Sequence, residues 1–216
     1  MSDNKPFLEV RAVFAKTGAA MYFSHLDLSR TVSRALRRSK QDIWMTEGFT
    51  PRPHLVFSPP LSLGYESTAE LMEFRLNLGA TLDKEAFKAA FPPAVQILDV
   101  YTPSRKMKEI AYADYTISFK ADITADEIKD YFSKPVMMLK KTKRSEATVD
   151  ITEFIESLDA VERDGVITLK TTLALSAEKS LSPAYIINAL KEKGADLTCI
   201  SVCRTGFKDN KKEIFK

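Results

Sequence analysis

Leu8–Ala15, with the sequence LEVRAVFA, alternates apolar and polar side chains and therefore predicts a β-strand. The next patterned stretch is Ser24–Lys40, with the sequence SHLDLSRTVSRALRRSK. Its apolar residues recur at helical spacing, so it predicts an amphipathic helix. A strand followed directly by an amphipathic helix is a βα unit. The strands that pair with it must come from the rest of the N-terminal half.

Four further elements are expected in that half. The next strand is either Gln41–Met45 or Leu55–Phe57, and a long strand follows at Thr68–Leu78. A short helix at Asp83–Phe91 ends at two prolines, and Ile97–Tyr101 forms the last strand. The resulting order, β-α-β-β-α-β, is the split βαβ arrangement of a ferredoxin-like domain.

The second half repeats this plan without residue-level identity. Val149–Val161 fits either a strand or a helix. The other expected elements are strands at Tyr112–Ala121, Pro135–Arg144, Val166–Leu175 and Thr198–Arg204, and helices that begin at Thr124 and Ser182. The predicted fold class is α+β, with two tandem ferredoxin-like (split βαβ) domains at residues 1–105 and 110–207. A polar linker joins them, and a basic tail at 208–216 is expected to be frayed.

The composition is that of an ordinary globular protein. The chain has 216 residues, of which 44% are hydrophobic and 28% charged. Its apolar runs are too short to cross a bilayer, and its first residues lack the pattern of a secretory signal. We therefore expect a cytoplasmic protein without a membrane partner.

The chain has two cysteines, Cys199 and Cys203, four residues apart in an expected strand. That spacing separates them by roughly 13 Å, too far for a disulfide, so buried or half-buried free thiols are expected. With two histidines and no Cys-x-x-Cys sequence, a metal site or iron–sulfur cluster has few ligands available. No metal and no cofactor are expected.

Positive charge is concentrated in one block. The net charge of the whole chain is +3, and Ser24–Ser58 holds six arginines and lysines against three acidic residues, which is also +3. The remainder of the chain is therefore balanced. This distribution favours an anionic partner for the N-terminal block.

The predicted helix Ser24–Lys40 has an arginine face. A helical projection places Leu28, Val32, Ala35 and Leu36 in a core stripe, and Arg30, Arg34, Arg37 and Arg38 on the opposite side. A guanidinium binds two phosphate oxygens at once and keeps its charge, so this face suits nucleic acid or another anion. The alternative is a solvated face, or one covered by acidic residues of the second domain.

The start of this helix holds three polar residues. Ser24 and Asp27 have the spacing of a helix cap, which explains both without catalysis. His25 lies at the edge of the apolar stripe. It is either a hydrogen-bonded core residue or an acid, base or anion ligand that faces a cleft.

The loop Glu47–Gly64 contains four prolines and two glycines, so it can hold a definite shape. It carries Phe49, Arg52 and His54, and basic residues interleaved with aromatic ones suit single-stranded nucleic acid. The alternative is a loop that covers the sheet edge, with Phe49 and Phe57 buried. A second basic run, Lys140 to Arg144, is either a solvated strand edge or an extension of the arginine surface.

Four motifs, taken together and in order, resemble a known family. They are Ser24-His-Leu-Asp-Leu, Arg34-Ala-Leu-Arg-Arg, Glu47-Gly-Phe-Thr-Pro-Arg-Pro and Phe57-Ser-Pro-Pro-Leu-Ser-Leu-Gly. Over nearly the whole chain they are similar to the radical-SAM-linked uncharacterised family, DUF2344. The resemblance implies a radical-SAM partner with a cobalamin-binding domain and an accessory role, and it supplies no catalytic residues. Any radical chemistry would belong to the partner, because two cysteines cannot form the three-cysteine cluster motif.

Three functions follow from these features. The first is an accessory protein of a radical-SAM system that binds RNA, or presents a substrate, through the basic helix and the Pro-rich loop. The second is a metal-independent endoribonuclease using His25 or His54, since the fold is similar to that of the tandem ferredoxin-like CRISPR RNA-processing proteins. Fold analogy alone does not establish activity. The third is a protein-interaction module. Binding is favoured over catalysis.

Overall fold

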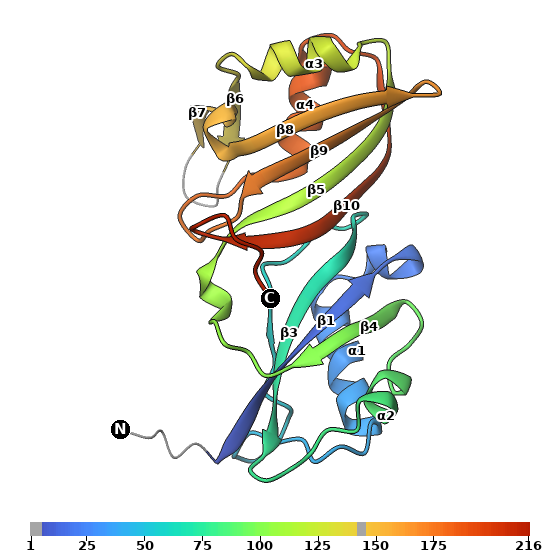
Figure 1. Ribbon diagram of the computed structural model, residues 1–216, viewed down its shortest axis with the longest axis vertical. Coiled ribbons are helices and arrows are strands. Elements are labelled where there is room, and N and C mark those ends of the chain that lie inside the picture. The colour runs from blue at the N-terminus through green and yellow to red at the C-terminus, as the bar shows by residue number, and fades with distance from the viewer. Residues whose placement is uncertain (1–5, 142–145) are drawn as a thin grey trace. The chain divides into compact units, whose positions relative to one another are not determined.

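The computed structural model describes residues 6–141 and 146–216. The chain divides into two compact units, one of Met1–Met107 with Lys216 and the other of Lys108–Phe215 (Figure 1). Both combine helices with a sheet whose strand pairings inside the unit run antiparallel. The α+β class expected from the sequence is therefore confirmed.

The sheet of the first unit is built around β1 (Phe7–Lys16). This strand lies between β4 (Val95–Tyr101) and β3 (Glu66–Asn77), and β2 (Val56–Phe57) pairs with β3. The order is β4-β1-β3-β2. Alternation fixes the faces, because Val10, Ala12 and Phe14 of β1 are buried on one side of the sheet.

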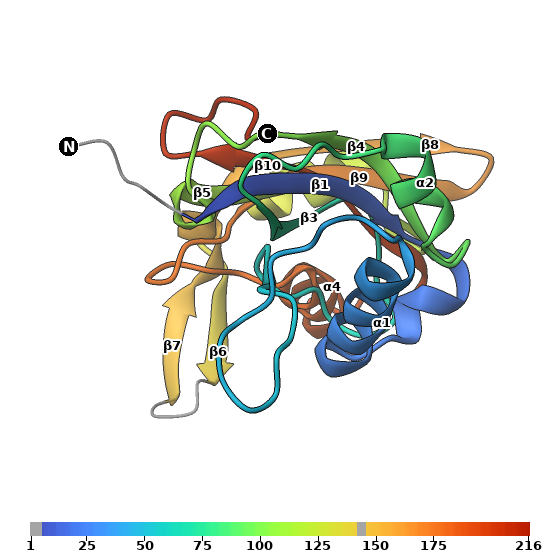
Figure 2. The same ribbon diagram turned by 90° about the horizontal axis from the view of Figure 1, so that it is seen from below.

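The described part of this unit contains the α-helices α1 (His25–Arg38) and α2 (Lys84–Ala89), with the short 3-10 helix η1 (Gly18–Tyr22) before α1. Figure 2 shows α1 lying across one face of β1 and β3. The core stripe predicted for α1 is confirmed, since its four apolar residues are all buried. On α2, Phe87 is fully buried, and its ring stacks on that of Phe74 with 5.1 Å between centroids. Burial of such side chains stabilises each helix on the sheet by about 1.5–3 kcal/mol per residue.

The second unit has a four-stranded sheet in the order β10-β5-β9-β8. Its strands are β5 (Ile110–Ala121), β8 (Ile155–Arg163), β9 (Val166–Ala174) and β10 (Leu197–Asp209). Helix α3 (Ala125–Phe132) packs against β8, and α4 (Pro183–Glu192) packs against β10. The 3-10 helix η2 (Met107–Glu109) precedes β5.

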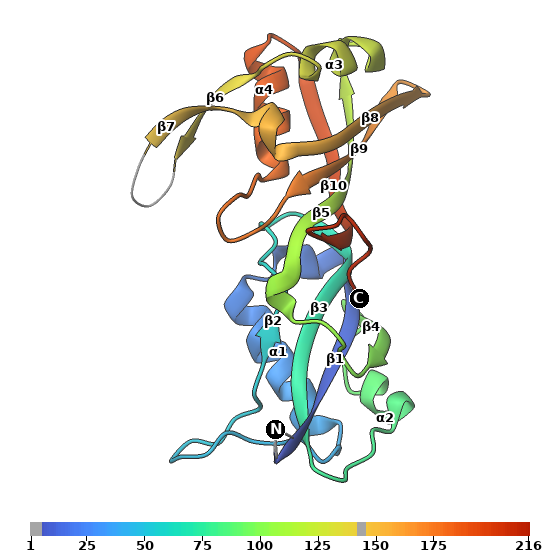
Figure 3. The same ribbon diagram turned by 60° about the vertical axis from the view of Figure 1, so that its left-hand side comes forward.

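A separate hairpin of β6 (Met137–Lys141) and β7 (Glu146–Asp150) projects from this sheet, as Figure 3 shows. The short 3-10 helix η3 (Ile151–Phe154) connects the hairpin to β8. The segment Val149–Val161, which fitted either a strand or a helix, thus forms strand on both sides of a 3-10 turn. The end of the predicted strand Pro135–Arg144, including Lys143 and Arg144, lies outside the described residues.

Three local expectations are resolved or corrected. Of the two candidates for the second strand, Val56–Phe57 forms β2, and Ile43 and Met45 make isolated bridges. The basic tail is not frayed, because Phe215 is buried and its N–H donates to the carbonyl of Phe207 at 2.8 Å. Cys199 is exposed rather than buried, Cys203 is half-buried, and neither forms a disulfide.

Candidate nucleic-acid or anion interface

A cleft of about 330 Å³ lies between α1 and the loop that follows it. Helix α1 contributes Ser29 and Ser33, which are four residues apart and share one helical face. The loop contributes Thr46, Arg52, Pro53, His54 and Leu55. The structure therefore places Arg52 and His54, both predicted site residues, in one cleft beside α1. The two serines were not predicted, although their spacing on the helix was a signal.

Hydrogen bonds between Thr46 and Arg52 close the base of the loop. The Thr46 N–H donates to the carbonyl of Arg52 at 2.8 Å, and the Arg52 N–H donates to the Thr46 hydroxyl at 3.2 Å. At its tip Gly48 has a φ of +115°, which favours glycine. Because the base is bonded and the prolines restrict φ, Arg52 is carried by a defined backbone.

The arginines of α1 divide into two pairs. Arg37 donates to the carbonyl oxygen of Pro51 at 3.0 Å, and Arg38 donates to that of Ala90 at the same distance. These two link the helix to the rest of the unit. Arg30 and Arg34 are exposed, and neither forms an ion pair within the part of the chain that the structure describes. Their guanidinium groups are fully available to an anion, whereas Arg37 and Arg38, which are also exposed, each donate one N–H to a carbonyl oxygen.

Phe49 lies at the loop tip and is fully exposed, with a solvent-accessible area that is 110% of the reference value for phenylalanine. The alternative in which Phe49 and Phe57 are both buried under the loop is therefore wrong for Phe49. Phe57 is half-buried and packs against the core. An aromatic ring without packing partners offers a free face for a base or another planar group.

His54 lies between the cleft and an aromatic cluster. Its ring is edge-on to Trp44 at 6.5 Å, and the guanidinium of Arg75 lies 3.8 Å above the ring of Phe7 and 5.4 Å from Trp44. Partial burial lowers the pKa of His54 below its usual 6.5, and the nearby charge of Arg75 acts in the same direction. The imidazole is therefore neutral at pH 7 and can both donate and accept a hydrogen bond.

His25 lies elsewhere. Its side chain is exposed, which rules out the core-residue alternative, and its ring is edge-on to Phe57 at 5.4 Å. It lines a small hollow of about 20 Å³ with Ser58 and Glu70, enough for one water molecule. Ser24 and Asp27 are caps as predicted, because the Asp27 N–H donates to the Ser24 hydroxyl. The Ser24 hydroxyl in turn donates to the Asp27 carboxylate at 2.6 Å, and this hydrogen bond lowers the pKa of Asp27.

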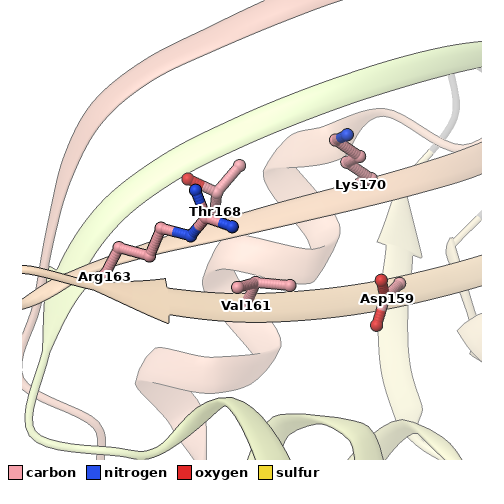
Figure 4. A pocket seen from close by; sticks show the side chains of 5 residues that line it. All are labelled: Asp159, Val161, Arg163, Thr168 and Lys170. Carbon is pink, nitrogen blue, oxygen red and sulfur yellow. The ribbon is translucent and has the colours of Figure 1, made fainter.

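The second unit has a polar hollow of about 270 Å³ on strands β8 and β9 (Figure 4). Asp159, Val161 and Arg163 line it from β8, and Thr168 and Lys170 line it from β9. This surface was not predicted from the sequence. The signal was the alternation of β9, whose polar residues at every second position fall on one face of the sheet.

A family model described as "Uncharacterized protein conserved in bacteria (DUF2344)" matches residues 9–183, which include α1 and the whole loop. The chain belongs to the DUF2344 family. No curated protein matches it. None of the helices formed by residues 6–141 and 146–216 has the length and apolar character needed to cross a bilayer.

Two solved structures are similar to this DUF2344 protein at low sequence identity. A chain in the crystal structure of a Cbf5-Nop10-Gar1 complex matches 71% of it at 10% identity and a TM-score of 0.42. The DUF2344 chain spans 40% of that chain. An unknown protein from Galdieria sulphuraria matches 89% of it, over 97% of its own length, at 12% identity and a TM-score of 0.26. Neither similarity is high enough to support an argument about function.

Proposed function

We propose that this DUF2344 protein is an accessory component of a radical-SAM system that binds single-stranded RNA through α1 and the Pro-rich loop. The observation that carries the proposal is the set of exposed guanidinium groups on α1 and on the loop, of which Arg52 lines the cleft. Arg30 and Arg34 on the helix and Arg52 on the loop are exposed, and none has an ion-pair partner among the described residues. Guanidinium groups left open in this way suit phosphate oxygens.

The neighbouring groups fit the other parts of a nucleotide. The ring of Phe49 is free to stack on a base. The hydroxyls of Ser29 and Ser33 and the neutral imidazole of His54 can hydrogen-bond to sugar or base edges. Unpaired RNA exposes its bases for such contacts, whereas a duplex hides them, and this favours a single strand as the ligand.

The accessory role is supported by the four motifs in the first sixty-four residues, which resemble those of the radical-SAM-linked family. The chain has two cysteines, so it cannot supply the three thiolates of a radical-SAM cluster. Under this proposal the partner performs the chemistry and this chain holds the substrate. Affinity purification from cells, followed by identification of co-purifying proteins, tests the partnership. Recovery of proteins without RNA would favour a protein-interaction module instead.

We also propose that each unit is a ferredoxin-like domain. The strand order β4-β1-β3-β2 of the first unit corresponds position by position to the order β10-β5-β9-β8 of the second. In both units a helix follows the first strand and another precedes the last strand. The β6–β7 hairpin is then an insertion between the first helix of the second unit and its second strand.

The RNA proposal is tested by fluorescence anisotropy with a labelled, unstructured RNA over a range of salt concentrations. The Arg30→Ala/Arg34→Ala variant should bind more weakly and lower the slope of log Kobs against log salt by roughly 1.4, about 0.7 for each lost phosphate contact. The control is Lys120→Ala/Lys211→Ala, which removes two exposed charges from the second unit. Absence of wild-type binding at low salt would rule the proposal out.

The neutral His54 beside Arg52 gives the endoribonuclease alternative one supporting observation. A neutral imidazole can act as a general base at pH 7, and Arg52 could hold the phosphate. His25 lines a different hollow, so the two histidines are not arranged as a joint acid and base in this structure. The alternative predicts RNA cleavage in EDTA that His54→Ala abolishes. Intact RNA after prolonged incubation with the wild type would exclude it.

A further inference from the structure

Two lysines of the second unit lie over the same aromatic ring. The ammonium nitrogen of Lys140, on β6, is 4.2 Å from the ring centroid of Phe154, the last residue of η3. The ammonium nitrogen of Lys179, in the turn between β9 and α4, is 5.1 Å from the same centroid. Three segments that are separate in the sequence therefore bring two positive charges to one place.

The backbone around these lysines is fixed by hydrogen bonds. The Lys140 ammonium donates to the carbonyl oxygen of Ser180 at 2.6 Å. Two hydrogen bonds close the turn that carries Lys179. The Ser176 N–H donates to the Lys179 carbonyl at 2.9 Å, and the Lys179 N–H donates to the Ser176 hydroxyl at 3.0 Å. The Lys140 ammonium is thus anchored next to the closed turn that carries Lys179.

The pair lacks a neutralising carboxylate in the described part of the chain. Glu153 and Glu178 are sequence neighbours of the site, but neither forms an ion pair with Lys140 or Lys179. The ring face offsets part of the charge. Partial burial, and then the positive charge of Lys179, lower the pKa of Lys140.

We propose that Lys140 and Lys179 form a second anion site that binds a phosphate group. A phosphate oxyanion that reaches both ammonium groups accepts hydrogen bonds from them and offsets their positive charge. Both ammonium groups are cationic donors with no acceptor atom of their own, so the site favours the oxygens of a phosphate over a neutral base. It uses none of the residues of the proposed RNA interface on α1 and the loop, and its ligand is either a nucleic-acid backbone or a small phosphate compound.

The direct test is a titration of ¹³C-lysine-labelled protein with inorganic phosphate, followed by NMR of the lysine ε-methylene signals. Lys140→Ala and Lys179→Ala assign the two signals. We expect both to move and saturate with phosphate, while the exposed Lys120 does not, and while sodium chloride at equal ionic strength has no such effect. Non-saturating changes, or equal changes in Lys120, would overturn the site.

A second measurement distinguishes the two sources of phosphate. Lys179→Ala changes an exposed turn residue and leaves the β6–β7 hairpin intact, so it avoids the risk that Lys140→Ala perturbs folding. If the ligand is RNA, this variant lowers the salt slope of RNA binding by roughly 0.7. If the ligand is a small phosphate compound, the slope is unchanged although phosphate binding is lost. Failure of the wild type to bind RNA would remove the proposed function without affecting the phosphate titration.

Discussion

The guanidinium of Arg37 donates a hydrogen bond to the carbonyl oxygen of Pro51 at 3.0 Å. Proline has no N–H, so its carbonyl is the one main-chain hydrogen-bonding group it can offer. The contact joins the last turn of α1 to the loop that carries Phe49 and Arg52. Arg37 therefore positions the loop, whereas Arg34, one turn earlier, has no such contact among the described residues.

This difference predicts distinct results for two arginine substitutions. Arg37→Ala should loosen the loop and weaken RNA binding, and Arg34→Ala should weaken RNA binding alone. The hydrogen bond is exposed, so its loss should lower the free energy of unfolding by no more than about 1 kcal/mol. Hydrogen exchange of the loop amides measures the loosening. Equal exchange in the two variants would mean that Arg37 does not position the loop.

Ser24→Ala tests whether this residue is a cap and nothing more. The Ser24 hydroxyl accepts from the Asp27 N–H, and removing such a cap costs about 1 kcal/mol of stability. RNA affinity should be unchanged, and Ser24→Thr should restore most of the stability. Urea unfolding and anisotropy measure the two effects. A large loss of RNA binding in a stable Ser24→Ala protein would show that the serine contacts the ligand.

Local pattern was sufficient to predict much of the fold. The alternation of Leu8–Ala15 and the helical spacing of Ser24–Lys40 specify β1 and α1, because each buries one face against the same core. The choice between Gln41–Met45 and Leu55–Phe57 could not be made locally, since both have strand character. It depends on which segment pairs with Glu73 and Met72 of β3, and Val56–Phe57 does so.

Part of the candidate cleft could be located from the sequence. Charge and proline content identify α1 and the loop, so Arg52 and His54 could be named from the sequence. Which arginines of α1 are hydrogen-bonded within the unit could not be inferred from the sequence. Arg37 and Arg38 donate to the carbonyl oxygens of Pro51 and Ala90. Every residue has a main-chain carbonyl, so the sequence does not indicate which one accepts. Lys140 and Lys179 are likewise thirty-nine positions apart in the sequence, and only the fold brings both of them to the ring of Phe154.

The lowered pKa of His54 predicts a pH dependence of stability. The unfolded chain binds the proton more readily than the folded one, so the stability associated with neutral His54 is complete above the usual pKa of 6.5. It is lost as the pH falls from 6.5 through the folded pKa. Histidine NMR should give a midpoint for His54 below 6.5, and Arg75→Gln should raise that midpoint because it removes the second cause of the shift. A midpoint at or above 6.5 in the wild type would contradict the burial of this ring.

Phe49 offers the sharpest separation between binding and stability. Its ring is fully exposed, so Phe49→Ala should change the free energy of unfolding by less than about 0.5 kcal/mol. If a base stacks on the ring, the same substitution should weaken RNA binding by about 1–3 kcal/mol. Phe49→Trp keeps an aromatic face and should retain the affinity.

The salt dependence of this variant distinguishes stacking from charge. Stacking releases no counterions, so Phe49→Ala should weaken binding equally at every salt concentration and leave the slope of log Kobs against log salt unchanged. Arg30→Ala/Arg34→Ala should instead reduce that slope. If Phe49→Ala binds RNA as tightly as the wild type, the loop tip is not a stacking platform, and the interface is reduced to the guanidinium groups of α1 and Arg52.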